Sequence, residues 1–369
     1  MGDGAIDHKA VRTLLSAVSW EALGRLLIRL RLVEIVGPAV QELAGPAIPA
    51  EFPAWVDATR QATSRRAAVH GLVLDRVLGA LRAAGIHAAP LKGLTLAQEA
   101  YGRIDVRPSA DLDVLVYARD LHAACSVLVA LGWDSPQDFV ESDGLPWHHF
   151  RLHSATAPSV ELHWRMHWHE RDFCRQALER AALAAPEGGA GQAGTLRLRS
   201  DDHLALLLMG YARDGFRGLR IPADIAALVR ATQPLAEARI PQALLPSVVS
   251  AAIAVRDLLG VDPFEGTDRG LGRSRGVRAA LALWDPLLRL EGTKNWADLY
   301  VVDVLLAPPS GLGAALRRRV WPPVPTMPER KDPGWIRARL PHLEYLARAA
   351  RGFAMTVPRM ARAMRSPRR

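Results

Sequence analysis

The eight residues Ser109–Val116 read SADLDVLV, and this short run decides how the chain is interpreted. Its apolar, β-branched character predicts a buried strand, yet it contains Asp111 and Asp113. Residues i and i+2 of a strand point to the same side, so both carboxylates project together while Leu112 and Val114 face the other way. Two like charges this close repel each other unless a cation lies between them. Mg²⁺, which prefers oxygen ligands, suits such a pair. The alternative is that the acids lie at the start of the strand, solvated or capping a loop.

Two flanking features extend this interpretation. The stretch SVELHWRMHW (159–168) predicts a strand that follows the strand WHHFRLH (147–153) through the turn SATAP. If it neighbours the first strand, Glu161 supplies a third carboxylate, and three carboxylates on adjacent strands can hold two metal ions. Upstream, Gly93 lies in LKG, between a short predicted strand and a helix, where backbone N–H groups favour phosphate. Together these features predict metal-dependent chemistry on a phosphate.

Composition gives broader expectations. The 369 residues carry a net charge of +9, which indicates an anionic partner such as a nucleotide, a nucleic acid, an acidic peptide or a membrane surface. No apolar run reaches the roughly 18 residues that a membrane span needs, and the N-terminus lacks a secretory signal. Cys125 and Cys174 make no disulfide framework. We therefore expect a cytoplasmic protein without stable membrane insertion.

The chain is predicted to be of the α/β (α+β) class, with helices before and after an α/β core in the sequence. Periodicity predicts helices over 8–44, a Pro-rich break at GPAIPAEFPAW (45–55) and a long helix over 59–84. We divide the chain into an N-terminal helical segment (1–58), an α/β core (59–199), a helical domain (200–305) and a basic C-terminal helical extension (306–369). PEGGAGQAG (186–194) predicts a flexible connection.

The order LKG…Y…R…DLDVLV…VELHW resembles the uncharacterised bacterial nucleotidyltransferase family of the DNA polymerase β superfamily. Gly93 matches the turn glycine of that superfamily, Asp111 and Asp113 its metal-binding pair, and Glu161 its third acid. Further positions match the fuller family pattern: Lys92, Tyr101, Arg107, His163, Trp164 and Asp224. The resemblance covers about residues 60–235 and implies a polymerase β-type mixed-sheet core with N-terminal and C-terminal helical additions. The sequence departs at Leu94, where the superfamily often has a phosphate-contacting serine, and in a longer interval between Gly93 and Asp111.

The resemblance implies an enzyme that moves a nucleoside monophosphate from a nucleoside triphosphate, ATP by default, to a hydroxyl group and releases pyrophosphate. Asp111 and Asp113 would bind both of two Mg²⁺ ions, with Mn²⁺ as a substitute. Glu161 would bind the ion nearer the acceptor and help remove the proton of its hydroxyl. Gly93 would let the backbone approach the phosphates.

Four side chains are candidates for nucleotide binding. Lys92 and Arg107 are expected to contact the triphosphate, the latter with its forked guanidinium, and Arg103 is a weaker candidate of the same kind. The alternatives are a solvated lysine at a strand end, and an Arg107 that pairs with Asp105 or Asp111.

His163, the fourth, shares a strand face with Glu161, so it either orients that acid or touches the base; a packed core histidine is the alternative. His167 and His169 continue the alternation, but no cysteine and no fixed spacing supports a zinc site. Asp224 is either a structural cap or part of the nucleotide cleft.

The acceptor is expected to be a hydroxyl on a peptide, a protein or a small molecule. The family resembled here occurs in natural-product gene neighbourhoods, including those for lasso peptides, which suggests peptide modification. One alternative is a toxin-like enzyme acting on tRNA or other RNA, which the net charge and the arginine-rich tail RMARAMRSPRR (359–369) favour. Against it, arginines are spread along the chain and no aromatic-basic RNA module is present. The other alternative is a non-catalytic nucleotide-binding protein, although all three expected carboxylates are present.

Overall fold

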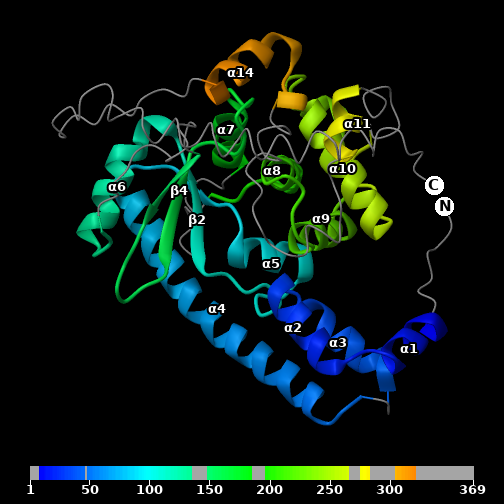
Figure 1. Ribbon diagram of the computed structural model, residues 1–369. Helices are drawn as coiled ribbons and strands as arrows, with labels where there is room; N and C mark the ends of the chain where they lie inside the picture. The colour runs from blue at the N-terminus through cyan, green and yellow to red at the C-terminus, as the bar shows by residue number, and fades with distance from the viewer. Residues whose placement is uncertain are drawn as a thin grey trace.

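The computed structural model describes residues 8–45, 48–134, 148–184, 196–265, 275–282 and 304–320 (Figure 1). The chain begins with the helices α1 (His8–Ser16), α2 (Trp20–Leu30), α3 (Val33–Ala44) and α4 (Glu51–Ala83). The core contains β1 (Ala88–Pro90), α5 (Gly93–Tyr101), β2 (Asp111–Val116), the 3₁₀ helix η2 (Ala118–Asp120), α6 (Leu121–Ala130), β3 (His149–Leu152), β4 (Ser159–His163) and α7 (Phe173–Ala184). After it come α8 (Ser200–Arg213), α9 (Arg220–Ala231), η3 (Glu237–Arg239), α10 (Leu245–Leu259), α11 (Arg275–Ala282), η5 (Pro309–Gly311) and α14 (Leu312–Val320). The α+β class predicted from the sequence is confirmed.

The four strands form one mixed sheet in the order β1-β2-β4-β3. β2 runs parallel to β4, whereas β1 and β3 pair antiparallel with their neighbours. The register places Asp113 opposite Glu161, and Glu161 opposite Arg151 of β3. The expected third carboxylate therefore lies directly beside the aspartate pair.

The strand alternation separates a structural face of the sheet from a polar one. Leu112, Val114 and Val116 of β2 are buried with apolar residues of α4 and α6 in one cluster. Burial of each such side chain contributes about 1.5–3 kcal/mol to stability. On the opposite face Leu115 packs in the cluster that contains α7 and α8 residues, and Asp111 and Asp113 share this face. One face of the sheet is thus covered by α4 and α6. The acids lie on the other face, which α7 and α8 cover.

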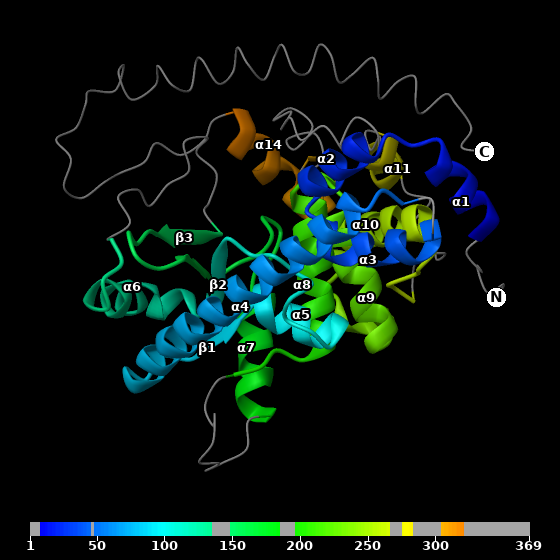
Figure 2. The same cartoon turned by 90° about the horizontal axis from the view of Figure 1, so that it is seen from below.

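The N-terminal helices pack against the helical domain. Leu27, Leu30, Val33 and further residues of α2–α4 form an apolar cluster, against which Leu219 and Ala223 at the start of α9 pack. Figure 2, seen from below, shows these N-terminal helices in front of α8, α9 and α10. The contact fixes the end of α2 beside the beginning of α9.

Two predicted boundaries are wrong. The long helix begins at Glu51 rather than at residue 59, because Pro53 occupies the first turn, where its missing N–H removes no helix hydrogen bond. The strand predicted over 159–168 ends at His163. Beyond it, the Glu170 carboxylate accepts hydrogen bonds from the Met166 and His167 amides at 2.8 and 3.3 Å, which folds the chain back on itself.

The predicted connection 186–194 and the tail 321–369 lie outside the described residues. The division into four segments stays a prediction, and α4 crosses its 58/59 boundary. Within the described ranges, every helix is too short or too polar to cross a lipid bilayer.

Candidate active site

Three carboxylates lie at the edge of one cavity. Asp111, Asp113 and Glu161 line a cavity of about 310 Å³ between the sheet and the helices α8 and α9. Asp113 and Glu161 are 7% and 6% exposed, whereas Asp111 at the strand start is half-buried. The strand pairing that brings them together is the structural basis of the site.

His163 lies between two of these acids. Its Nε2 is 2.9 Å from Asp113 Oδ1 and 3.4 Å from Glu161 Oε2, and the side chain is almost fully buried. Lys92 Nζ approaches the same Asp113 oxygen at 3.2 Å. His163 and Lys92 therefore hold the two buried carboxylates in position.

Two residues of β3 complete this face. Arg151 donates from Nε to Glu161 Oε1 at 2.8 Å, and its Nη2 lies 3.4 Å from Asp111 Oδ2. His149 Nε2 is 3.6 Å from Glu161 Oε2. Burial and the neighbouring His163 lower the pKa of His149 to about 4, so at neutral pH its contact with Glu161 involves an uncharged ring.

The three acids differ in how well their charge is compensated. Burial, followed by the charges of Asp113 and Glu161, raises the pKa of Asp111. Burial also opposes ionisation of Asp113, but Lys92 and His163 hold its pKa well below the usual range. For Glu161 the same opposition by burial is outweighed by His163 and His149, and its pKa is lowered to about 2. Asp111 is thus the acid whose charge most needs a further cation.

The turn before α5 requires glycine. Gly93 has φ +62°, a left-handed conformation that strains other residues, and it follows Lys92 at the start of the helix. The Leu91 amide donates to Asp113 O at 3.0 Å, and Ser109 Oγ donates to Asp111 O at 2.9 Å. The first bond ties the turn to the acidic strand, and the second fixes the segment that leads into that strand.

Arg107 pairs with neither Asp105 nor Asp111, the two acids named as alternatives to a triphosphate contact. Its Nε donates to Asp224 Oδ2 at 2.9 Å, and Tyr101 OH donates to the other oxygen at 3.0 Å. Asp224 is fully buried, so it anchors α9 to the core, and Arg107 still lines the cavity. Arg103 instead pairs with the neighbouring Asp105 and is not among the residues that line this cavity.

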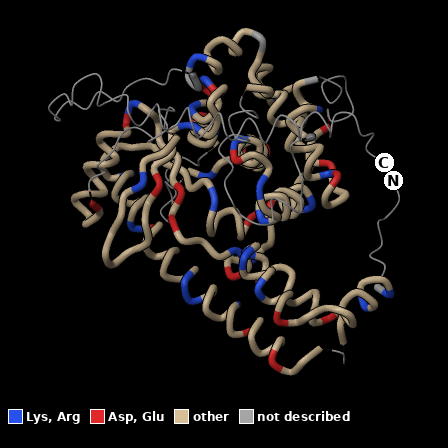
Figure 3. Tube along the Cα trace, viewed as in Figure 1, with Lys and Arg blue, Asp and Glu red and all other residues tan. Residues whose placement is uncertain are grey.

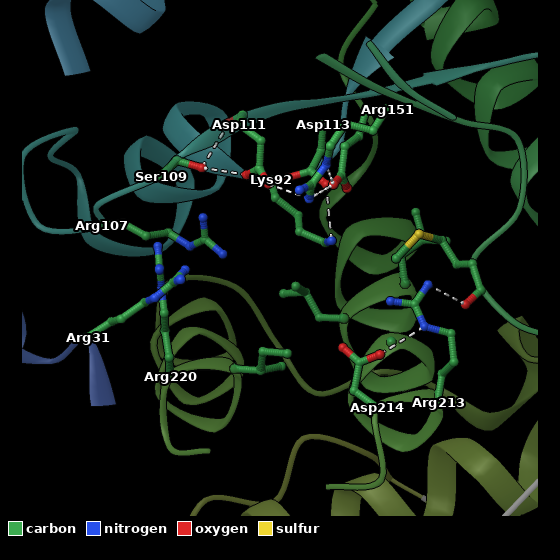
Figure 4. A pocket seen from close by; sticks show the side chains of 16 residues that line it. Arg31, Lys92, Arg107, Ser109, Asp111, Asp113, Arg151, Arg213, Asp214 and Arg220 are labelled. Carbon is green, nitrogen blue, oxygen red and sulfur yellow. Dashed lines mark hydrogen bonds and ion pairs between the residues drawn. The ribbon is translucent and has the colours of Figure 1, made fainter. Parts of the chain in front are cut away.

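The opposite wall of the cavity is strongly basic. Figure 4 shows Arg31, Arg107 and Arg220 together on one side, and Arg213 with Asp214 on another. Arg213 donates to Asp214 Oδ1 at 3.0 Å and to Met166 O at 3.3 Å. The cavity therefore joins an acidic wall on the sheet to basic side chains from the helices.

The family described as uncharacterised nucleotidyltransferase matches residues 16–244, more than half of the chain. The chain belongs to this family. It is therefore a transferase, and the match extends the predicted region of resemblance to include α2 and α3. No curated protein matches the chain.

The donor atoms of this nucleotidyltransferase fit a divalent cation. Asp111, Asp113 and Glu161 present oxygen ligands on adjacent strands, and burial and mutual repulsion leave the charge of Asp111 undercompensated. Single ligand atoms of His149, Glu161 and His163 also lie within 4.8 Å of one another. Arg151 and Lys92 contact the same carboxylates, so a metal ion bound by these acids would compete with both side chains.

His167 and His169 do not line the cavity of the three carboxylates. His167 Nε2 is 3.1 Å from Ser247 Oγ of α10, and the His169 amide donates to His167 Nδ1 at 3.2 Å. Neither belongs to the His149 cluster, the one group of metal-ligand type found among the described residues. Trp164 is half-buried and packs against Phe150.

Sequence reasoning missed His149, which contacts Glu161, and several residues that line the cavity. His149 and Arg151 had a usable signal, because alternation in the predicted strand 147–153 puts them on one face, opposite His163 and Glu161. No local pattern pointed to the others: Arg31, Ser109, Arg213, Asp214 and Arg220.

Proposed function

We propose that this nucleotidyltransferase moves a nucleoside monophosphate from a nucleoside triphosphate to an acceptor hydroxyl and releases pyrophosphate. One observation carries the proposal: Asp111, Asp113 and Glu161 lie side by side on parallel strands and face a cavity with basic side chains opposite. Attack on the α-phosphorus builds negative charge on oxygen atoms, and catalysis of such transfer consists mainly of positioning and charge stabilisation. An acidic wall for cations and a basic wall for phosphates meet both needs.

Asp111 and Asp113 would hold two Mg²⁺ ions, or Mn²⁺ in their place, and Glu161 would join them at one ion. Bound there, the ions would polarise the phosphoryl oxygens and lower the pKa of the acceptor hydroxyl. His163 keeps Asp113 and Glu161 oriented through its two contacts. Lys92 offers a positive charge at the edge of the acidic face.

When no metal ion is bound, Arg151 compensates part of the negative charge of the carboxylates. It spans Asp111 and Glu161, and its side chain is 48% exposed, so it has room to turn toward solvent or toward a bound nucleotide. Glu161 itself is buried, and it keeps its contacts with His163 and His149 when Arg151 turns away.

For the acceptor we propose a hydroxyl on a peptide, including a lasso peptide or another natural product, a protein or a small molecule, with ATP as the default donor. An RNA acceptor is disfavoured by the charge distribution. Figure 3 shows basic residues spread over all parts of the described chain rather than gathered on one surface.

The test is transfer of label from nucleoside triphosphates labelled at the α- or the γ-phosphate, in the presence of Mg²⁺ and candidate acceptors. The proposal requires that only the α-label reaches an acceptor and that Asp111→Asn or Glu161→Gln abolishes transfer. Asp172→Asn, at an exposed pair with Arg175, is the matched control and keeps activity. Transfer of the γ-label would contradict the reaction, and labelling of RNA alone would contradict the acceptor class.

A further inference from the structure

Three arginines from distant segments meet on the wall that faces the acids. Arg31 follows α2, Arg107 precedes β2, and Arg220 is the first residue of α9. All three line the cavity, and Figure 4 shows their guanidinium groups close together. The packing of Leu219 and Ala223 against the N-terminal cluster holds Arg31 next to α9.

The backbone at Arg31 is strained. This residue caps α2 in the left-handed conformation, with φ 56° and ψ 43°, where glycine is favoured and an arginine destabilises the chain. No hydrogen bond or ion pair links its guanidinium to another described residue, while the side chain lines the cavity. An arginine kept in such a conformation, and aimed into a cavity, indicates a role outside folding.

The position of Arg220 also lowers the stability of the folded chain. It lies at the positive end of the α9 dipole, and the first turn of this helix has no acid. Its Nη2 donates to Pro108 O, but its Nε is buried without a partner. Burial, and then the positive charge of Arg107, lower the pKa of Arg220 to about 10.

The two acids near these arginines, Asp224 and Glu34, already accept hydrogen bonds from other side chains. Asp224 is bound by Arg107 and Tyr101, and Glu34 accepts a hydrogen bond from Thr63 at 2.6 Å. The two carboxylates do not fully balance three guanidinium groups. The wall therefore retains positive charge that an anion from outside the chain would compensate.

We propose that Arg31, Arg107 and Arg220 form a subsite for the polyphosphate tail of the nucleotide donor. Guanidinium groups match phosphate oxygens through paired N–H donors, and three of them suit a polyanion. The assignment to the donor rests on the proposed function, because the tail extends from an α-phosphorus held at the carboxylates of the same cavity. The N-terminal helices thus contribute directly to substrate binding through Arg31.

The experiment measures binding of inorganic tripolyphosphate by calorimetry in the absence of divalent ions, with wild type, Arg31→Gly and Arg29→Ala. Arg31→Gly removes the guanidinium and relieves the backbone strain, so this variant folds. Arg29 is an exposed arginine near the end of the same helix and lies outside the cavity lining, so Arg29→Ala removes equal charge. We expect binding to weaken at least tenfold in Arg31→Gly and to be unchanged in Arg29→Ala.

Three results would overturn the subsite: no tripolyphosphate binding by wild type, equal affinity in wild type and Arg31→Gly, or equal losses in both variants. Tripolyphosphate must also displace a bound nucleoside triphosphate. Simultaneous binding of both would assign the arginines to a phosphate on the acceptor and refute the donor assignment.

Label transfer separates the subsite proposal from the proposed reaction. Transfer that proceeds equally well in Arg31→Gly refutes the subsite alone, whereas Arg31-dependent binding without any transfer refutes the proposed reaction alone.

Discussion

Replacement of Asp224 by alanine should destabilise the whole chain, because it leaves a charge buried without its partner. Arg107 and Asp224 have side chains that are 7% and 0% exposed, and Tyr101 donates to the same carboxylate. Breaking a buried pair by removing one partner costs about 3–5 kcal/mol. With a shift of about 2–3 °C per kcal/mol for a chain of this size, the unfolding midpoint should fall by roughly 6–15 °C.

The assay is thermal and urea denaturation followed by circular dichroism, with Glu21→Ala as the control. Glu21 and Arg25 form an exposed pair on α2, so that change should cost less than about 0.5 kcal/mol. The double variant Arg107→Met/Asp224→Leu should be more stable than Asp224→Ala, since it leaves no charge buried. A loss below about 1 kcal/mol in Asp224→Ala, or a double variant less stable than it, would refute this account of the α5–α9 contact.

Gly93→Ala should destabilise by about 1–2 kcal/mol because of its positive φ, whereas Gly79→Ala inside α4 should stabilise by about 0.5–1 kcal/mol; equal unfolding midpoints would contradict this. In the metal-free chain the His149 imidazole should titrate near pH 4 by NMR, and a midpoint near 6.5 would show that burial does not govern it. Its folded-state pKa lies below the unfolded value, so its contribution to stability is present above pH 6.5 and is lost as the pH falls toward 4. Arg151→Met should raise the affinity for Mn²⁺ about two- to fivefold, read by electron paramagnetic resonance, because the guanidinium no longer competes for Asp111 and Glu161; unchanged affinity would contradict that competition.

The sequence predicted the elements that depend on local patterns. The alternation of Ser109–Val116 was enough to identify β2 and to put Asp111 and Asp113 on one face. The same reasoning made Glu161 a candidate neighbour, and the parallel pairing of β2 and β4 confirms that adjacency. Such features follow from residue spacing along a single strand, which the sequence displays directly.

Contacts between distant segments could not be predicted in the same way. Asp224 meets Arg107 across 117 positions of the chain, so the nearby Asp105 and Asp111 were the obvious partners for this arginine. Arg31 reaches the cavity only because α2 packs against the start of α9. The end of β4 depended on the hydrogen bonds that the Glu170 side chain offers to the backbone. These outcomes depend on how helices and loops pack, which periodicity does not encode.

The most direct test of the central claim measures binding and turnover of each of the four nucleoside triphosphates with Mg²⁺. It compares wild type with Asp111→Asn/Asp113→Asn, using calorimetry and pyrophosphate release. The account predicts that one nucleotide binds in a metal-dependent manner, and that both binding and pyrophosphate release are lost in the double variant while its fold is kept. Failure of folded wild type to bind any nucleotide, or equal turnover by the double variant, would show that these two acids serve another purpose.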